Sequence, residues 1–345
     1  MIDYRIDLSE AHAHRYLVTL TLSKPEPQVH LSLPVWIPGS YLIREFARHL
    51  NGLQASQGGR PCPITTQGKA DWVVHCEGKG ALTVRYEVYA NDTSVRTAFL
   101  DHRRGFFNGT SVFLCVQGRE DTPHAVQIKA LPKGWSVATA LPARQVDARG
   151  QGWYEASDYD ALVDHPFELG TFWRQAFNVR GVPHELVVTG ASEHADLDRL
   201  LADTQAICSQ EIAFWHGRKK PPFSRYVFLL NVVEDGYGGL EHRDSTALIC
   251  SRKDLPRRDH QDTQSEGYTT LLGLISHEYF HTWNVKRLKP IEFAPYDYTR
   301  ENHTEMLWFF EGFTSYYDDL FLLRAGLIKP ADYLKKILTA RVYDV

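Results

Sequence analysis

The feature that most constrains this sequence is a pair of histidines spaced four residues apart. His277 and His281 lie in residues 271–283, a stretch with apolar residues at helical spacing and no proline. Residues four apart are one helical turn apart, so both imidazoles face the same side and can hold one Zn²⁺. Glu278 directly follows the first histidine. We therefore expect its carboxylate beside the metal, where it can take a proton from a zinc-bound water.

A third ligand is needed to support this interpretation. The chain contains 16 His, so a His-Glu-x-x-His match can arise from composition alone. A catalytic zinc site uses three protein ligands and keeps one position open. Residues 307–317 form an aromatic, helix-prone stretch that holds one carboxylate, Glu311. A glutamate in apolar surroundings is costly to bury unless it is paired or binds a metal. We therefore expect Glu311 to be the third ligand, the alternative being a solvated helix residue.

Composition limits the class of protein. The chain has 345 residues, 43% hydrophobic and 23% charged, which is ordinary for a globular protein and long enough for two domains. The net charge of −4 and the lack of a long basic run do not support nucleic-acid binding. The five Cys are scattered and lack metal-ligand spacing, so we expect thiols rather than disulfides. No apolar stretch resembles a signal peptide or a membrane span, so we expect no membrane association and a cytoplasmic location, the alternative being a periplasmic protein whose signal peptide has been removed.

Residues 1–172 are expected to form a β-rich domain. Apolar residues alternate with polar ones in residues 14–23, 29–35 and 82–88, and clusters of Gly, Pro, Asn and Asp separate these stretches. This pattern predicts an antiparallel sandwich or a saddle-shaped sheet. Residues 36–41 interrupt it, and we interpret them as a buried aromatic corner, with substrate contact as the alternative.

Residues 173–345 are expected to form a second domain of mixed sheet and helices, which makes the whole chain α+β. A continuous apolar stretch, as in residues 226–233, is typical of a central buried strand. The other expected elements are a strand at 177–189, an amphipathic helix at 194–215, a strand at 246–250, a charged surface connection at 252–266 and the two helices that carry the zinc ligands.

Four stretches resemble the glycyl aminopeptidase family, zinc peptidases of the thermolysin-like or gluzincin type that often carry a PDZ domain. They are residues 36–41, 237–242, 277–290 and 308–317, and the likeness extends to about residue 335. The resemblance implies a thermolysin-like catalytic domain with one Zn²⁺. It also implies the assignments already made, with His277, His281 and Glu311 as ligands and Glu278 as general base.

The resemblance further implies how a substrate is held. Residues 235–241 contain three glycines, which permit close approach of another backbone. In related zinc aminopeptidases the comparable strand lines the substrate groove, which assigns Gly238 and Gly239 to substrate binding. There a glutamate binds the free α-amino group, and by resemblance this is Glu241; the alternative is a glycine-rich hairpin with a surface glutamate. The implied partner is a peptide with a free N-terminus and a small first residue, Gly or Ala.

Other polar residues near the ligand helices receive lesser roles. Asp318 lies two helical turns after Glu311, so we expect it to accept a hydrogen bond from a ligand histidine. Asn284, Lys286 and Arg287 are expected to brace the zinc helix or the loop after it. His303 is a candidate for substrate contact.

The chain is shorter than the family resemblance implies. Family members usually continue for a few hundred residues, whereas this chain stops at Val345 inside an expected helix, so we expect a truncated member. The tyrosine that stabilises the tetrahedral intermediate in related aminopeptidases would fall beyond that point. Three alternatives remain open. The same zinc site without an amine anchor would suit an endopeptidase, and the scaffold could also serve a zinc hydrolase of another bond such as an epoxide. A chain without the oxyanion donor could be a non-catalytic zinc-containing module that binds peptides. The sequence predicts no oligomeric state.

Overall fold

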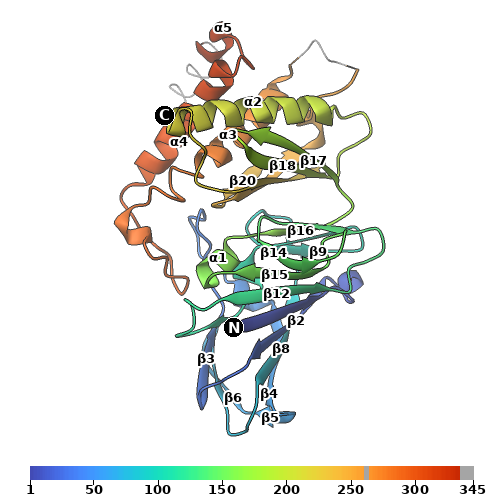
Figure 1. Cartoon of the computed structure of the whole chain (residues 1–345), viewed down its shortest axis with the longest axis vertical. Helices are drawn as coiled ribbons and strands as arrows, with labels where there is room; N and C mark the ends of the chain where they lie inside the picture. The colour runs from blue at the N-terminus through green and yellow to red at the C-terminus, as the bar shows by residue number, and fades with distance from the viewer. Residues whose placement is uncertain (260–263, 335–345) are drawn as a thin grey trace. The chain divides into compact units, whose positions relative to one another are not determined.

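The computed structural model describes residues 1–259 and 264–334. The chain divides into two compact units (Figure 1). The first unit comprises Met1–Thr171 and Pro295–Asn302, and the second comprises Phe172–Ala294 and the chain from His303 on. Strands dominate the first unit, while the second combines a sheet with long helices, so the expected α+β class is confirmed. The helix expected around residues 341–345 lies outside the described residues.

All residues of the first unit are described, and its strands form sheets of eight, four and four strands. The largest has the order β14-β15-β12-β1-β2-β8-β4-β5, and the others β13-β16-β10-β9 and β11-β3-β7-β6. The strand bounds are β1 Ile2–Asp7, β2 Arg15–Leu22, β3 Gln28–Ser32, β4 Leu50–Gln57, β5 Arg60–Cys62, β6 Ile64–Gly68, β7 Asp71–His75, β8 Leu82–Tyr89, β9 Ala98–Leu100, β10 Arg104–Phe107, β11 Cys115–Val116, β12 His124–Lys129, β13 Ser136–Ala138, β14 Ala143–Val146, β15 Gly152–Ala156 and β16 Phe167–Gly170. Short helices connect them: α1 Tyr159–Val163, η1 Ala11–Ala13, η2 Phe46–His49 and η3 Gly109–Ser111.

The alternating apolar pattern forms the core of the first unit. In β2 every second side chain, from Tyr16 to Leu22, is buried, and the intervening residues are partly or fully exposed. One pairing differs from the expected antiparallel arrangement, because β1 runs parallel to β12. The other edge of β1 is occupied by β2. A strand that arrives after a long excursion of chain can join the free edge in parallel orientation.

Residues 295–302 also belong to the first unit. The backbone N–H of Val35 donates to the carbonyl of Tyr298 at 2.9 Å, and that of Ile43 donates to the Glu301 carboxylate at 3.0 Å. The hydroxyl of Tyr298 bonds to Asp160. Next to this segment Trp36 is buried and donates its indole N–H to the Ser40 carbonyl, in agreement with a buried aromatic corner.

Among the described residues of the second unit, five strands form one sheet in the order β17-β18-β19-β21-β20. The bounds are β17 Trp173–Val179, β18 Val182–Thr189, β19 Tyr226–Val233, β20 Gly238–Glu241 and β21 Ser245–Ser251. Strand β19 is almost completely buried and runs parallel to both neighbours, β18 and β21. Strand β20 forms an edge of the sheet and runs antiparallel to β21.

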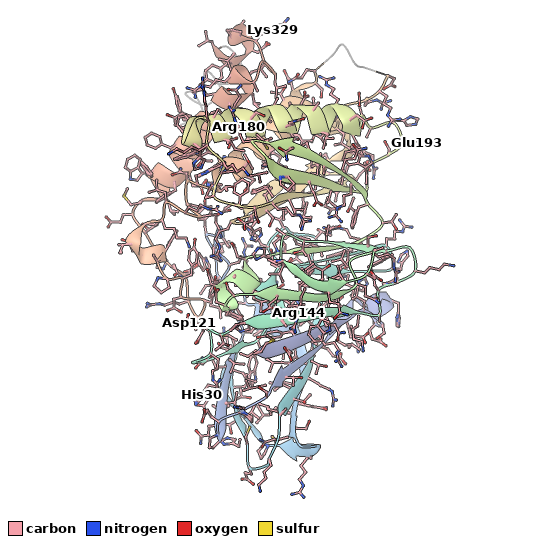
Figure 2. The ribbon with its side chains drawn as sticks, viewed as in Figure 1. His30, Asp121, Arg144, Arg180, Glu193 and Lys329 are labelled. Atoms are coloured by element: carbon pink, nitrogen blue, oxygen red, sulfur yellow. The ribbon has the colours of Figure 1, made fainter. Side chains whose placement is uncertain are left out.

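The single strand expected at residues 177–189 is wrong, because this stretch folds as a hairpin of β17 and β18. The turn consists of Arg180 and Gly181, whose φ angles are 53° and 79°. Two consecutive positive φ angles are those of the type I′ turn that joins twisted antiparallel strands. Arg180 is exposed at this turn and is labelled in Figure 2.

The helices of the second unit pack on its sheet and on one another. They are α2 Leu197–His216, α3 Glu266–Phe280, α4 Leu307–Arg324 and the short α5 Pro330–Asp332, with η4 Arg252–Asp254 and η5 Ile291–Phe293. The side chains of Asp196 and Ser265 cap α2 and α3 by accepting backbone N–H bonds. Helix α3 contacts α2, α4, β20 and β21. None of the helices described in residues 1–259 and 264–334 is long and apolar enough to cross a bilayer.

Candidate metal centre

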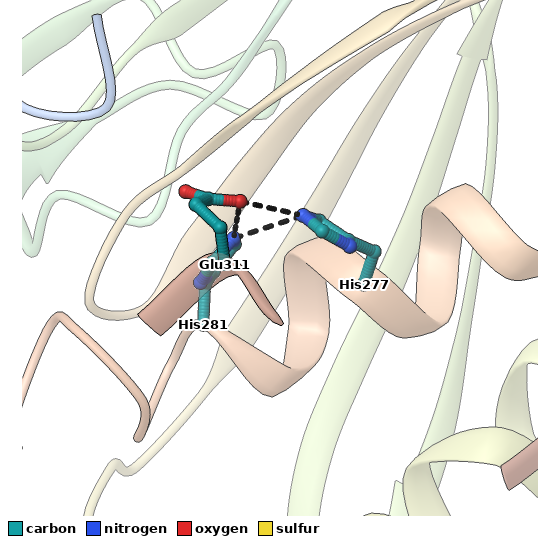
Figure 3. Close-up of side chains that lie close together, drawn as sticks. All are labelled: His277, His281 and Glu311. Atoms are coloured by element: carbon teal, nitrogen blue, oxygen red, sulfur yellow. Dashed lines mark hydrogen bonds and ion pairs between the residues drawn. The ribbon is translucent and has the colours of Figure 1, made fainter. Parts of the chain in front are cut away.

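Two helices bring three potential metal ligands together in the second unit (Figure 3). The Nε2 atoms of His277 and His281 lie 3.0 Å apart, and Glu311 Oε2 lies 3.5 and 3.7 Å from them. Zinc bonds to imidazole nitrogen and carboxylate oxygen are close to 2 Å, so tetrahedral ligand atoms are roughly 3.3 Å apart. The three donor atoms therefore fit around one Zn²⁺.

The end of helix α3 fixes the second histidine. His281 follows the last helical residue, and its Nδ1 lies 2.9 Å from the carbonyl oxygen of Asn284. The side-chain amide of Asn284 donates to Phe310 O and to Thr314 Oγ1, both at 3.1 Å on α4. Val285 comes next with φ 132°, a strained angle for a β-branched residue. This strained turn presents the Asn284 carbonyl to the imidazole, which directs Nε2 toward the other ligands.

A carboxylate on α4 fixes the first histidine. Asp318 Oδ2 lies 3.0 Å from His277 Nδ1, the contact expected from its spacing to Glu311. Burial alone would lower the pKa of His277, but its hydrogen bonds to Asp318 and Glu311 outweigh burial and raise the pKa to about 11. The surrounding carboxylates therefore stabilise a positive charge at this position. A bound divalent cation would be stabilised by the same carboxylates.

Glu278 directly follows His277 on helix α3, where it is buried, with 5% of its surface exposed. Its Oε2 has no hydrogen-bond partner in the part of the chain that the structure describes. Burial raises its pKa to about 7; the histidines His277 and His281 oppose this, and the carboxylates of Glu241 and Glu311 add to it. Gly239 on β20 leaves the space that this carboxylate occupies, because a Cβ at residue 239 would lie 2.1 Å from Glu278 Oε1.

The other expected substrate residues lie on the same edge strand. Glu241 is the last residue of β20 and is 7% exposed, and its charge acts on both Glu278 and His281. A Cβ at Gly238 would meet nothing within 4 Å. His303, the candidate for substrate contact, is exposed.

The structure corrects one argument made from the sequence. Glu311 was expected to be buried among its aromatic neighbours, yet its side chain is 37% exposed, and Trp308 and Phe313 beside it are also exposed. Helix α4 has aromatic residues on its buried face and also on its exposed face. An aromatic sequence was therefore not evidence that Glu311 is buried. Glu311 therefore reaches the two histidines from a partly exposed position on α4 and not from a buried one.

Several supporting residues were not predicted as such. Asn284 was expected only to brace the helix, whereas its carbonyl oxygen is also a partner of His281 Nδ1. Arg287 does brace this turn, since its guanidinium donates to Thr282 O, Arg243 O and Asp244 Oδ1. Glu211 was missed: it is fully buried in α2 and its Oε1 lies 2.9 Å from Ser276 Oγ. A charged residue on the apolar side of an amphipathic helix was the available signal.

Comparison with known proteins agrees with this geometry. Residues 3–171 match the sequence profile of the peptidase M61 N-terminal domain, and residues 270–342 match that of M61 glycyl aminopeptidase. No curated protein matches the chain significantly. A solved aminopeptidase N family protein from Idiomarina loihiensis is 44% identical with a TM-score of 0.93, covering 97% of this chain. The chain spans 56% of the length of that relative.

More distant solved structures share the fold. Aminopeptidase A from Legionella pneumophila, solved with aspartic acid, is 13% identical with a TM-score of 0.59, over 93% of this chain and 37% of that one. An M1 zinc metallopeptidase from Deinococcus radiodurans is 14% identical with a TM-score of 0.56, over 100% of this chain and 74% of that one. On the two profile matches and the Idiomarina relative, this chain belongs to the M61 glycyl aminopeptidase family of zinc metallopeptidases.

Proposed function

We propose that this chain carries the catalytic centre of a zinc aminopeptidase that removes the first residue of a peptide. The observation that carries the proposal is the triangle of two imidazole nitrogens and one carboxylate oxygen, with a buried glutamate beside it. The chain spans only 56% of its solved relative, so the activity proposed is that of the protein to which this centre belongs.

The donor set suits zinc. Two neutral imidazoles and one carboxylate, with a fourth position open, are the ligands of many catalytic zinc sites. Asp318 and the carbonyl of Asn284 each lie within hydrogen-bond distance of an Nδ1 atom, which leaves both Nε2 atoms to bind metal. Bound Zn²⁺ would supply a Lewis acid and lower the pKa of a water at the open position.

Glu278 is proposed as the general base. It takes a proton from the attacking water and passes it to the nitrogen of the leaving amine. One of its oxygens has no partner among the described residues, so it can accept that proton without first breaking a hydrogen bond. A cation held by His277, His281 and Glu311 would place positive charge nearby and favour the carboxylate form of Glu278.

Glu241 is proposed to bind the α-amino group of the substrate. It ends the edge strand β20, whose free side can pair with an extended peptide. Gly238 and Gly239 permit the peptide backbone to approach closely. A carboxylate here forms an ion pair with a terminal ammonium, which interior peptide bonds lack. The preference for a small first residue, Gly or Ala, rests on the family resemblance alone, and the cytoplasmic location rests on the sequence interpretation; both are part of the proposal.

The test begins with metal analysis of the purified protein and with paired reporter peptides that carry a free or an acetylated N-terminus. We expect one zinc per chain and cleavage of the free peptide only. Glu278→Gln should keep the zinc and lose activity by about 10³-fold or more, while Glu305→Gln, an exposed acid near the start of α4, should change neither. Equal cleavage of both peptides would favour an endopeptidase, and peptide binding without turnover a non-catalytic module.

Glu241→Gln separates the amine anchor from the catalytic centre. The variant should retain zinc and raise KM for the free peptide by about 10-fold or more, because one charge-assisted hydrogen bond is lost. An unchanged KM would remove Glu241 from the proposal and leave the metal centre intact.

A further inference from the structure

Two partly exposed cysteines of the first unit, Cys62 and Cys76, lie close enough to form a disulfide. All five cysteines are free thiols; Cys115, Cys208 and Cys250 are buried, whereas Cys62 and Cys76 are partly exposed. Cys62 is the last residue of β5, and Cys76 directly follows the last residue of β7. Neither residue takes part in the metal centre, so this pair is independent of the proposed function.

The strand register places these cysteines opposite one another. Strands β6 and β7 are antiparallel, with Ile64 opposite Val74. One step further, the backbone N–H of His75 donates to the carbonyl of Pro63 at 2.9 Å, which makes residues 63 and 75 a hydrogen-bonded pair. Continued by one more residue, this register brings Cys62 opposite Cys76, and the interaction between the two thiols agrees with that position.

Backbone hydrogen bonds also show whether Cys62 and Cys76 are a hydrogen-bonded or a non-hydrogen-bonded pair. The N–H of Cys76 points away from β6, since it donates to the Pro27 carbonyl at 2.8 Å. Cys62 and Cys76 therefore occupy a non-hydrogen-bonded position, where the side chains lie on one face and the Cα atoms are about 4.5 Å apart. That separation is within the range of about 4.4–6.8 Å seen for disulfides.

The surroundings of the thiols agree with this placement. Burial and the neighbouring thiol of Cys62, which is also its hydrogen-bond partner, raise the pKa of Cys76 to about 11. The Sγ atom of Cys62 also lies 3.9 Å from the Arg60 carbonyl. Cys62 lines an open hollow of ≈ 770 Å³ between β4, β5 and β8, together with Ala55, Ser56 and Thr83. A small oxidant can therefore reach this sulfur without unfolding the sheet.

We propose that Cys62 and Cys76 form a redox-active pair that closes to a reversible disulfide when a small disulfide such as oxidised glutathione is present. The Cys62 thiolate attacks one sulfur of the oxidant, forms a mixed disulfide and releases one reduced glutathione. The Cys76 thiolate then attacks Cys62 Sγ and releases the second. Two protein thiols are oxidised, and one oxidised glutathione is reduced to two thiols.

The Cys62–Cys76 disulfide would connect two of the three sheets of the first unit near the point where the chain passes from one to the other. β5 belongs to the eight-stranded sheet and β7 to a four-stranded sheet of the fully described first unit, and the chain passes between these sheets at residues 62–64. Closing the loop from residue 62 to residue 76 restricts the unfolded chain, so the oxidised protein should resist thermal unfolding better than the reduced protein.

The experiment treats the full chain with oxidised glutathione and maps thiols by mass spectrometry after alkylation. We expect the loss of two alkylatable thiols, a peptide pair linked through Cys62 and Cys76, and a rise of about 5 °C in the melting temperature that dithiothreitol reverses. Formation should speed up as pH rises, since the thiolates react. The buried cysteines Cys115, Cys208 and Cys250 serve as internal controls and should remain reduced.

Single variants give the decisive comparison. In Cys76→Ser, Cys62 should stop at the mixed disulfide with glutathione, and no rise in melting temperature should follow. Cys62→Ser should leave Cys76 unmodified under the same conditions. The proposal is overturned if the wild-type protein carries glutathione on each cysteine separately, dimerises through Cys62, or leaves both thiols reduced.

Discussion

At the scale of single residues, the metal centre depends on what lies beside the ligands as much as on the ligands. His277 and His281 each use Nδ1 for a contact with the protein, the first with Asp318 and the second with the carbonyl of Asn284. These contacts fix the rotation of each ring, so that both Nε2 atoms face Glu311. The residue pattern shows which side chains can bind metal, and their neighbours determine which nitrogen they offer.

Gly239→Ala tests whether the position of Glu278 matters for activity. The added methyl would lie 2.1 Å from Glu278 Oε1, so the carboxylate has to move while the backbone keeps its conformation. Misplacing a reacting group by about 1 Å can lower the rate by about 10²-fold. We expect kcat to fall by about that factor with zinc content unchanged. Gly238→Ala is the comparison, because its methyl would meet no protein atom within 4 Å and so leaves Glu278 in place. Since Gly238 is proposed to lie along the bound peptide, this variant should change KM rather than kcat; an equal loss of kcat in both variants would contradict the explanation.

Asp318→Asn tests the support of His277. The amide keeps the shape of the side chain but removes the charge that faces Nδ1. Loss of such a partner typically lowers metal affinity by about 10- to 100-fold. Competition with a chelator measures this affinity directly. Asp198→Asn, at an exposed position in the first turn of α2, should leave metal affinity unchanged.

At the scale of elements, one hydroxyl group joins three helices behind the metal centre. Ser276 of α3 has its Oγ 2.9 Å from both Glu211 Oε1 on α2 and the Asp318 carbonyl oxygen on α4. All three residues are buried. Ser276 directly precedes His277, so the contact sets how α3 and α4 lie beside each other where the ligands project.

Ser276→Ala should therefore destabilise the second unit. The change leaves the buried carboxyl group of Glu211 and the Asp318 carbonyl without this partner, at a cost of about 1–3 kcal/mol. Urea unfolding followed by a probe in α3 or α4 measures the loss. Ser209→Ala is the control: its Oγ donates to the Gln205 carbonyl within α2 and is only partly buried, so we expect a change below about 0.5 kcal/mol. Similar losses in both variants would show that the helix contact is unimportant.

At the scale of the whole molecule, the strands and helices with regularly spaced apolar residues could be predicted from the sequence. The strands β2, β8, β19 and β21 and the helix α2 follow directly from apolar spacing. Other features depend on contacts distant in sequence. Residues 295–302 belong to the first unit through hydrogen bonds to Val35 and Ile43, which no local pattern indicates. The spacing of Asp318 from Glu311 correctly suggested contact with a histidine, whereas the exposure of Glu311 required the orientation of α4.

Two of the buried histidines, one in each unit, make the fold sensitive to acid. His124 in the first unit and His184 in the second are 1% and 0% exposed, and burial lowers the pKa of each from 6.5 to about 4. His184 Nε2 lies 2.8 Å from the Tyr279 hydroxyl, and its Nδ1 lies 3.0 Å from the Val182 carbonyl. Both imidazoles are therefore neutral in the folded protein at neutral pH.

Because the folded state binds fewer protons than the unfolded state between these pKa values, stability should fall as the pH drops from 6.5 to about 4 and level off below. Each histidine should contribute roughly 3 kcal/mol to this loss. Hydrogen exchange in β19 reports the second unit, and exchange in β2 reports the first. His184→Gln should flatten the pH dependence in β19 and leave β2 unchanged, with His124→Gln giving the reverse. An undiminished acid response of β19 in His184→Gln would assign the sensitivity to other groups.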